Sequence, residues 1–414
     1  MKTLLSSLAL LHFEHTLAIV SIPPLAKTDN YKKWAIMDFN FSAEHNLLRE
    51  TVRRFSEAEL APLVKEADDN EIFPPGLFLK WGEMGLIAAR YPQKDGGGGF
   101  DKIADCIIRE ETSRVCQAFA SSLSAHSHLG IWPIWRAGTD AQKKRYLKPA
   151  LAGKKVSCFG LSEPDGGSNI RALKTHAKKV DGGYRINGSK LYITNAPMAD
   201  FMLLAARTSP ELSAKSISMF IVELPAKGVT IQKLEKESIR ASETGMVFID
   251  DLFVPDDCLL GGEEGTYPVI LESLSENRVG VSANCLGMAK AAFEEANRYA
   301  HERIIANHPI GKFQAIGHKL ANMSTEIEAA QWMVYYGAWR IDQGTLDDAT
   351  AAKVKLNASE MAVKVSEDAI RILGGAGIMR EYPVGRIHRD TLLYIIGEGT
   401  SEIQRNIIAR SLAF

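Results

Sequence analysis

The chain has no surplus of either charge and no long hydrophobic run. Lys and Arg number 49 and Asp and Glu number 50 among 414 residues, so the formal net charge is −1. A nucleic-acid-binding protein needs a basic surplus to displace counterions from phosphates, so this balance argues against nucleic-acid partners. The apolar runs are too short to span a bilayer, so no membrane partner is expected.

Cysteine is scarce, and its spacing excludes familiar metal and redox sites. The five cysteines are an odd number and contain no CxxC pair, on which structural zinc and thioredoxin-type sites depend. This pattern predicts reduced thiols, a cytoplasmic location and no metal site. His126 and His128 diverge if they lie on a helix, which predicts a hydrogen-bonded pair and not a pair of metal ligands.

The first 36 residues do not share the pattern of the rest. They hold a short apolar run at 4–11, but Pro23-Pro24 makes a poor signal-peptide cleavage site. Met37 begins a more natural opening, so we interpret residues 1–36 as an upstream-start artefact or an unpacked tail. An export signal is the alternative.

From residue 37 to 153 the pattern predicts an N-terminal helical domain. Ser42 is a candidate N-cap, and Leu47, Leu48 and Val52 follow at helical spacing. Residues 154–262 instead favour a small antiparallel β domain, with strand-like runs at 201–206, 216–224, 229–234 and 246–254. Within it, Asn187-Gly188 between alternating apolar residues predicts the turn of a hairpin over 184–194.

Clean helical periodicity returns in residues 263–414 and predicts a C-terminal helical bundle. Ile316, Leu320 and Met323 begin one apolar stripe, and Val354, Ala358 and Met361 begin another. Gly374-Gly375 should end the second helix. The glycine-rich 374–377 follows a helix and not a strand, which argues against a Rossmann dinucleotide loop.

Common catalytic signatures are missing: the chain has no GxSxG elbow, HExxH pair or phosphate-binding Walker loop. Three segments nevertheless combine small residues, hydroxyls and charges in a way that suits contact with a flat ligand. They are 160–169, which enters the β domain, 190–195, on the return strand of the predicted hairpin, and 396–405, between C-terminal helices.

Taken together with the order of these segments along the chain, residues 37–414 closely resemble the acyl-CoA dehydrogenase family of flavoenzymes. The resemblance rests on SEPDGGS (162–168), YITN (192–195), Arg303 with Pro309-Ile310 and Phe313-Gln314, LGGAG (373–377) and GEGTSEIQR (397–405). It implies a helical domain, a β domain and a C-terminal four-helix bundle, FAD bound between the last two, and a homotetramer built as a dimer of dimers.

The resemblance also assigns roles to single residues. Glu398 matches the base that removes the α-proton of an acyl-CoA thioester, and Ser168, Arg278 and Gly399 match substrate-binding positions. A carboxylate in a water-poor site becomes more basic, as that task requires. The positions matching FAD contacts are Leu161, Ser162, Tyr192, Ile193, Thr194, Arg303, Gln314, Arg371, Gly375, Thr400 and Glu402.

Several positions depart from the family pattern. Asn277 stands where some branched-chain members carry their base, which strengthens the assignment of Glu398. Ala120 stands where the glutaryl-CoA branch has an arginine, which argues against a decarboxylating glutaryl-CoA activity. Ala306-Asn307 replaces a common Phe-Gly, and Arg371 replaces a usual glutamine.

The resemblance therefore implies an enzyme of fatty acid metabolism that converts an acyl-CoA to a trans-2-enoyl-CoA. A hydride would pass to flavin N5 and electrons onward to an electron-transferring flavoprotein. Two alternatives remain open: an acyl-CoA oxidase or flavin monooxygenase on the same scaffold, and a non-catalytic flavoprotein. The sequence does not define the length or substituents of the acyl group.

Overall fold

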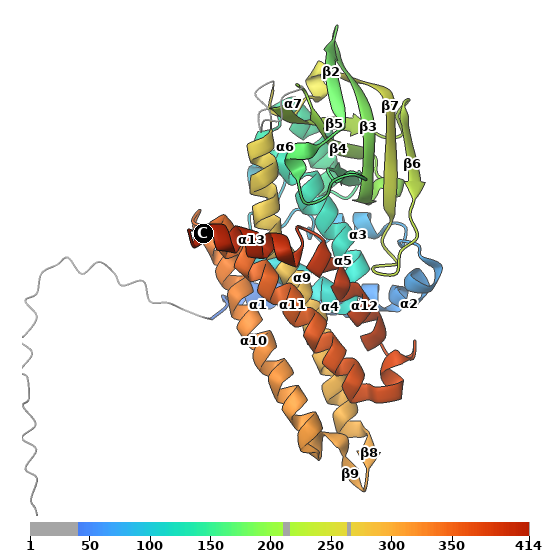
Figure 1. Cartoon of the computed structure of the whole chain (residues 1–414), viewed down its shortest axis with the longest axis vertical. Helices are drawn as coiled ribbons and strands as arrows, with labels where there is room; N and C mark the ends of the chain where they lie inside the picture. Colours follow the sequence, from blue (N-terminus) through green and yellow to red (C-terminus); the bar gives the residue numbers. More distant parts are fainter. Residues whose placement is uncertain (1–39, 210–215, 263–265, 414) are drawn as a thin grey trace, which may run out of the picture. The chain divides into compact units, whose positions relative to one another are not determined.

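The computed structural model describes residues 40–209, 216–262 and 266–413. Its elements follow the predicted order of helices, strands and helices, which confirms the fold class (Figure 1). The segment 1–36 lies outside the described residues. Among the described helices, none combines the length and the apolar character needed to cross a membrane.

The N-terminal helices begin at the predicted cap, where the Ser42 hydroxyl accepts a 3.1 Å hydrogen bond from the His45 amide. His126 and His128 are buried and confirm the predicted hydrogen-bonded pair, reaching Ala150 O and Ser273 O respectively. The helices are α1 (Ala43–Phe55), α2 (Ala61–Asn70), α3 (Leu77–Glu83), α4 (Lys102–Val115), α5 (Gln117–Ser124), α6 (Trp132–Ala137), α7 (Asp140–Gln142) and α8 (Lys148–Leu151).

A seven-stranded sheet follows these helices. Its strands are β1 (Ser157–Gly160), β2 (His176–Val180), β3 (Gly183–Thr194), β4 (Phe201–Arg207), β5 (Ile217–Glu223), β6 (Val229–Lys233) and β7 (Thr244–Pro255). Most of its strand pairs are antiparallel, as predicted, but β1 pairs with β4 in parallel, and β2 does so at one position. These strands are far apart in the sequence, so local pattern carries no signal of their relative direction.

The predicted turn at Asn187-Gly188 was wrong. Residues 183–194 form the single strand β3, and the hairpin turn lies earlier, where Val180 faces Gly183. Gly188 has φ 150°, and a Cβ there would lie 2.5 Å from Thr175 Oγ1. Glycine is required at this position for close approach at a strand irregularity and not for a turn.

Strand β4 shows how the sheet is anchored. Each of its residues is buried. Phe201, Leu203 and Ala205 join the core formed with the N-terminal helices, whereas alternate residues such as Met202 and Leu204 join the core inside the sheet. Because successive side chains point to opposite faces, a strand covered on both sides reads as a continuous apolar run.

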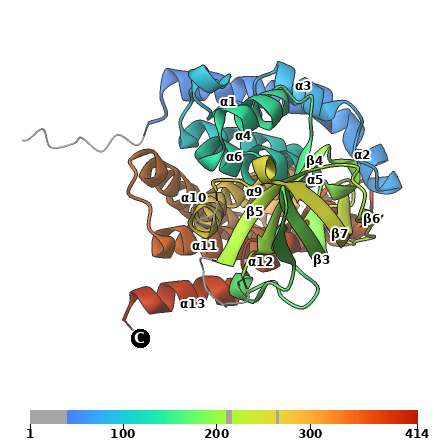
Figure 2. The ribbon, with the colours of Figure 1, turned by 90° about the horizontal axis from the view of Figure 1, so that it is seen from above.

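The C-terminal helices are α9 (Tyr267–Glu302), α10 (Gln314–Asp342), α11 (Asp348–Leu373), α12 (Val384–Ile396) and α13 (Ser401–Ser411), with the short hairpin β8 (Ile304–Ile305) and β9 (His308–Pro309) between α9 and α10. The predicted stripes of α10 and α11 and the helix end at Gly374 are confirmed. Figure 2 shows α9 near the centre, with the N-terminal helices on one side and α12 and α13 on the other.

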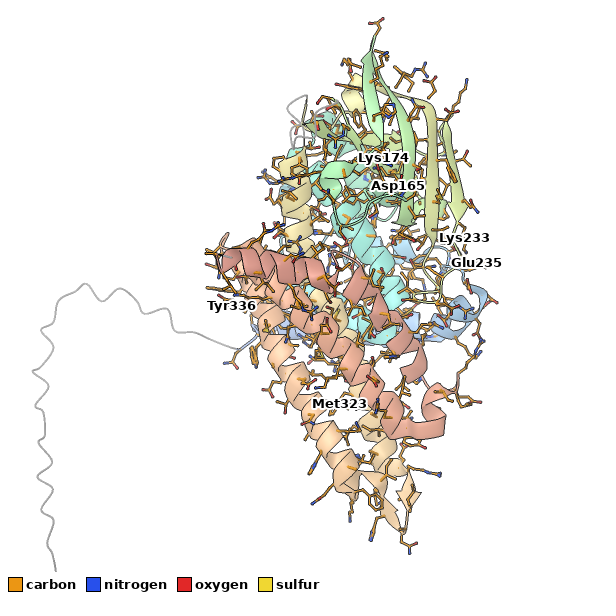
Figure 3. All side chains as sticks on the ribbon, viewed as in Figure 1. Asp165, Lys174, Lys233, Glu235, Met323 and Tyr336 are labelled. Carbon is orange, nitrogen blue, oxygen red and sulfur yellow. The ribbon has the colours of Figure 1, made fainter. Side chains whose placement is uncertain are left out.

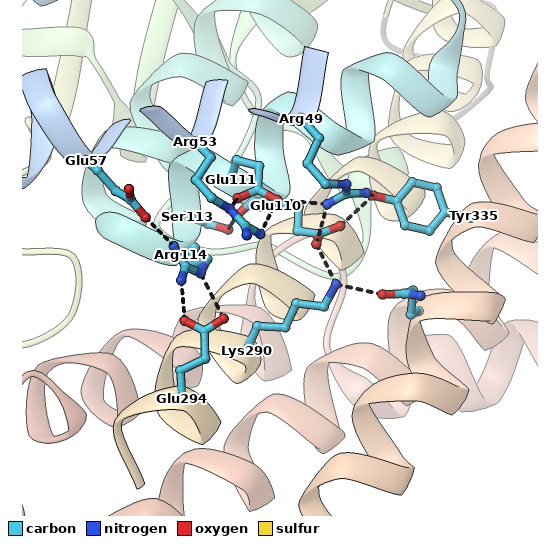
Figure 4. Close-up of polar contacts among 11 residues, drawn as sticks. Arg49, Arg53, Glu57, Glu110, Glu111, Ser113, Arg114, Lys290, Glu294 and Tyr335 are labelled. Atoms are coloured by element: carbon cyan, nitrogen blue, oxygen red, sulfur yellow. Dashed lines mark hydrogen bonds and ion pairs between the residues drawn. The ribbon is translucent and has the colours of Figure 1, made fainter. Parts of the chain in front are cut away.

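Buried ion pairs join α1 and α4 to the C-terminal helices (Figure 4). Arg49 Nη1 donates to Glu110 Oε1 at 2.7 Å and to Glu111 Oε1 at 2.8 Å. Lys290 Nζ, on α9, donates to Glu110 Oε1 at 2.6 Å, and Arg49 Nη2 reaches the Tyr335 hydroxyl on α10. Breaking one partner of such a buried pair is strongly destabilising, so this network fixes the helices that carry the candidate site.

Candidate functional site

Glu398 lies in the four-residue connection between α12 and α13, as predicted. Its φ is 57°, and the next residue, Gly399, has φ 85°. A side chain other than glycine is uncommon in this left-handed region and persists only where its surroundings hold it there. The strained turn aims the carboxylate into the protein, since its Oε2 atom is completely buried.

Two side chains from neighbouring helices hold the backbone of this turn. Lys355 Nζ, from α11, donates a 2.7 Å hydrogen bond to the Gly399 carbonyl oxygen. Gln404 Nε2, from α13, donates to the carbonyls of Glu398 at 3.1 Å and Gly399 at 2.8 Å. Lys355 is 1% exposed, and burial lowers its pKa to about 8. A buried ammonium and an amide therefore lock the left-handed turn.

The surroundings of Glu398 make its carboxylate a stronger base. Burial is the largest effect and raises its pKa above the ordinary glutamate value. The side chain of Asn277 and the positive charges of Arg278 and Lys355 act in the opposite direction. Oε2 has no hydrogen-bond partner within the described chain, so one carboxylate oxygen is available to accept a proton.

Arg278 lies beside this carboxylate on α9. Its side chain is 13% exposed and reaches Asp348 Oδ1 only at 3.5 Å, while its Nε atom is buried without a partner in the described residues. Burial lowers the pKa of the guanidinium, and Glu398 counteracts this effect. The structure thus brings together Glu398, Gly399 and Arg278, three of the residues predicted to act on the substrate.

A second group of predicted residues is held together by a buried ion pair in the sheet domain. Lys190 Nζ, fully buried, donates to Glu163 Oε1 at 2.8 Å and to the Leu161 carbonyl at 3.1 Å. The Leu191 amide donates to the Ser162 carbonyl at 2.9 Å. These bonds join the loop after β1 to strand β3, so the predicted positions 161–162 and 192–194 share one region.

Tyr192 occupies an irregularity of β3, with φ 61° and 71% of its surface exposed. Such a bulge redirects a side chain out of the regular alternation, here toward the outside. Ser162 and Thr194 are half-buried, so their hydroxyls remain reachable. The side chain of Ile193 is 3% exposed and packs inside the sheet, which leaves its backbone to face a ligand.

The remaining residues of the 162–168 motif lie on the surface. Asp165 and Lys174 form an exposed ion pair of 2.7 Å across this loop (Figure 3). Ser168 is also exposed. In two perpendicular views the loop lies beside the start of α13, which Thr400 caps by accepting a hydrogen bond from the Ile403 amide (Figures 1 and 2). Glu402 is exposed in the first turn of that helix.

Other predicted FAD-binding residues lie far from this region within one chain. Arg303 comes 25 residues after Arg278, immediately after the end of α9. At 1.5 Å per helical residue, the two residues lie about 37 Å apart. It is exposed, as is Gln314 at the start of α10. Arg371 and Gly375 are at the far end of α11, where Arg371 pairs with Glu367. One chain therefore does not bring all the predicted FAD contacts together.

The residues that position the backbone of the site are Glu163, Lys190, Lys355 and Gln404. Three of them lie within the segments singled out from the sequence, but no role was predicted for any of the four, since each reads in isolation as a surface polar residue. Lys355 comes one residue after the apolar position Val354, which places it at the side of the apolar stripe of its helix. Its contact with the Gly399 carbonyl arises only from the tertiary fold.

Comparison with known proteins now identifies the family. Residues 42–154, 158–252 and 265–413 match the N-terminal, middle and C-terminal domains of acyl-CoA dehydrogenase. The chain belongs to the acyl-CoA dehydrogenase family. Members of this family are FAD-dependent oxidoreductases that act on the CH–CH bond of acyl-CoA.

Individual relatives are similar over nearly their whole length. The short-chain specific acyl-CoA dehydrogenase of Clostridium acetobutylicum is 37% identical over 90% of this chain and 99% of its own. The mitochondrial short-chain specific enzyme of Bos taurus is 38% identical over 89% and 90%. The structure of butyryl-CoA dehydrogenase from Megasphaera elsdenii is 36% identical, with a TM-score of 0.88 over 91% of this chain and 100% of that one.

Proposed function

We propose that this acyl-CoA dehydrogenase removes the α-proton of its thioester with Glu398 and forms a trans-2-enoyl-CoA. The observation that carries the proposal is the Glu398 carboxylate, held in a strained turn with a buried, unpartnered Oε2 and a pKa raised by burial. Burial makes such a carboxylate a stronger base, which favours transfer of a carbon-bound proton when the neighbouring carbonyl is polarised.

The residues of the sheet domain fit a flavin. Tyr192 offers an exposed aromatic ring beside the half-buried hydroxyls of Ser162 and Thr194, and the Lys190–Glu163 pair holds both segments in place. Polar and aromatic groups on a rigid surface suit a flat ring with heteroatoms along one edge. We assign Leu161, Ser162, Tyr192, Thr194 and the backbone of Ile193 to this role. FAD, when bound, supplies the oxidant that takes the hydride from the β-carbon.

We infer that a neighbouring subunit completes the FAD site in a homotetramer. Four of the predicted residues are exposed or open to solvent at the ends of α9 and α11 and at the start of α10, where they would face another copy: Arg303, Gln314, Arg371 and Gly375. Helix α10 also exposes an aromatic stripe, with Trp332, Tyr336 and Trp339 between 37% and 48% exposed. Tyr336 is labelled in Figure 3. Exposed apolar patches of this kind are typical of protein interfaces.

Thr400 and Glu402 at the start of α13, and Ser168 on the loop opposite, would border the bound cofactor and the CoA portion. An electron-transferring flavoprotein is the proposed electron acceptor, and the five buried, unpaired cysteines support a cytoplasmic location. The domain limits 37–153, 154–262 and 263–414 remain our proposal.

A direct test is anaerobic addition of butyryl-CoA to the purified FAD-loaded enzyme while the visible flavin absorbance is recorded. We expect bleaching, and recovery of the colour when an electron-transferring flavoprotein is added. Fast recovery in air with release of peroxide would instead support the oxidase alternative. An unbleached flavin with every acyl-CoA tried would contradict the proposed function.

A further inference from the structure

Beyond Glu398, four helices contribute buried polar side chains to one cluster. They are Arg109 from α4, Gln117 from α5, Asn284 from α9 and Tyr394 from α12, each no more than 3% exposed. Polar groups of this kind are normally buried only when their hydrogen-bonding capacity is used. Their positions therefore call for an account of every donor and acceptor.

Part of that capacity is used within the chain. The amide nitrogens of Gln117 and Asn284 each donate a 2.8 Å hydrogen bond to the Tyr394 hydroxyl. Arg109 Nε donates to Asp105 Oδ2 at 3.0 Å, and its Nη1 donates to Asn277 Oδ1 at 3.1 Å. The guanidinium lies against α9 at Gly280, where a Cβ would come within 2.7 Å of Nη1.

The rest is unused among the described residues. Arg109 Nη2, Gln117 Oε1 and Asn284 Oδ1 are fully buried without a partner. Because the Tyr394 hydroxyl already accepts two hydrogen bonds, its own hydrogen also needs an acceptor. Exchanging the amide oxygen and nitrogen of either residue would let the Tyr394 hydroxyl donate to that oxygen, but would leave the amide nitrogen without a partner.

The cluster is directly connected to the proposed base. Asn277, which accepts from Arg109, lies beside Glu398 and helps set its pKa. Tyr394 precedes Glu398 by four residues at the end of α12, and the two interact electrostatically. The unpaired donors and acceptors therefore belong to side chains that adjoin the proposed base, and not to a remote part of the core.

Arg109 is bound, through a shared carboxylate, to a second buried cation. Arg109 shares its partner Asp105 with Lys102, whose Nζ donates to the same Oδ2 atom at 2.6 Å. Two buried cations thus share one carboxylate, and an alkyl chain placed against them would leave Arg109 Nη2 unpaired. An oxygen atom, of a hydroxyl or of a carboxylate, would satisfy that donor.

We propose that the acyl group of the substrate carries an oxygen substituent, a hydroxyl or a carboxylate, that accepts a hydrogen bond from Arg109. This inference rests on the proposed function, because it takes the space beside Glu398 as the acyl-binding space. Gln117, Asn284 and Tyr394 complete the polar surroundings of the oxygen. Arg109 is the residue that selects oxygen-bearing acyl groups over plain alkyl groups.

The test compares matched thioesters on the FAD-loaded enzyme. Butyryl-, valeryl- and hexanoyl-CoA are measured against the ω-hydroxy and ω-carboxy acyl-CoA of the same length by anaerobic flavin bleaching. We expect kcat/KM for one oxygen-bearing series to exceed that of its alkyl counterpart by about 10- to 100-fold, the range of a hydrogen bond to a charged group. The hydroxy and carboxy series show which form of oxygen is bound.

Two substitutions of Arg109 test whether this residue causes the preference for oxygen-bearing acyl groups. Arg109→Met should lower kcat/KM for the oxygen-bearing thioesters more than for the alkyl ones and so remove the preference, and Arg109→Lys should retain part of the preference for carboxylates. Arg54→Met, at an exposed arginine on α1, is the control and should match the wild type. If Arg109→Met does not fold, the wild-type comparison and Arg109→Lys still decide the question.

The inference is wrong if, at each length, the wild-type enzyme has the same kcat/KM for the alkyl thioester as for both oxygen-bearing thioesters. Water would then satisfy the polar groups of the cluster. It is also wrong if Arg109→Met lowers activity equally for all substrates. These outcomes differ from failure of the proposed function, in which no thioester of any kind bleaches the flavin.

Discussion

Lys355 offers a sharp test of how the site is held. Its Nζ donates a 2.7 Å hydrogen bond to the carbonyl oxygen of Gly399, directly after the proposed base. In Lys355→Met this carbonyl loses its charged donor, while the methionine side chain keeps most of the buried apolar volume. The left-handed turn at Glu398 is then held by Gln404 alone, so the carboxylate should spend less time in its productive position.

The size of the effect follows from the bond that is lost. A hydrogen bond to a charged group contributes about 1.5–3 kcal/mol, and each 1.4 kcal/mol corresponds to about a tenfold change in rate. Because Gln404 still binds the same carbonyl, we expect the lower half of that range. The rate of flavin reduction should fall by about 10- to 40-fold.

The assay is anaerobic stopped-flow bleaching at saturating substrate, with FAD content and thermal unfolding measured on the same samples. Lys353→Met, at an exposed lysine two residues earlier on α11, is the matched control and should behave as the wild type. Lys355→Arg keeps a charged donor and should recover part of the rate. If Lys355→Met retains FAD and reduces it at the wild-type rate, the proposed positioning role is refuted.

Further predictions concern the pH dependence of flavin reduction, the buried ion pair of the sheet domain and the proposed subunit interface. Glu398 must be ionised to accept a proton, and burial raises its pKa. On acidification, the rate of flavin reduction should therefore decline at a higher pH than it would with an exposed glutamate as the base. A rate that stays constant down to the ordinary pH range of glutamate titration would contradict this. Lys190→Met leaves Glu163 buried without its cation and should lower the free energy of unfolding by about 3–5 kcal/mol in urea titrations. The exposed control Lys174→Met should change it by less than about 1 kcal/mol, and equal losses would refute the distinction. Trp339→Lys should dissociate the proposed tetramer in analytical ultracentrifugation, and an unchanged sedimentation coefficient would exclude α10 from the interface.

Local sequence pattern was sufficient for most of the fold. Helical periodicity located α10 and α11, and the Ser42 cap marked the first described helix. The errors arose where distant segments decide the structure. Gly188 is explained by the approach of Thr175, which immediately precedes β2, and the parallel pairing of β1 with β4 leaves no mark on either strand.

The site was predicted from motifs, but its supporting residues were not. Arg109 lies in a stretch of charged residues on α4 that reads as a solvated helix face, yet most of that helix is buried. Its partner Asn277 is 168 residues away along the chain. The use of a charged side chain in such a place depends on tertiary contacts, which one sequence does not reveal.

Replacement of the proposed base tests the central claim most directly. Glu398→Gln preserves shape but removes the proton acceptor, and Glu381→Gln is the control at an exposed glutamate before α12. Both variants should bind FAD as the wild type does. We predict that acyl-CoA bleaches the flavin of the wild type and of Glu381→Gln but not that of Glu398→Gln. Wild-type bleaching by Glu398→Gln would show that another group removes the proton.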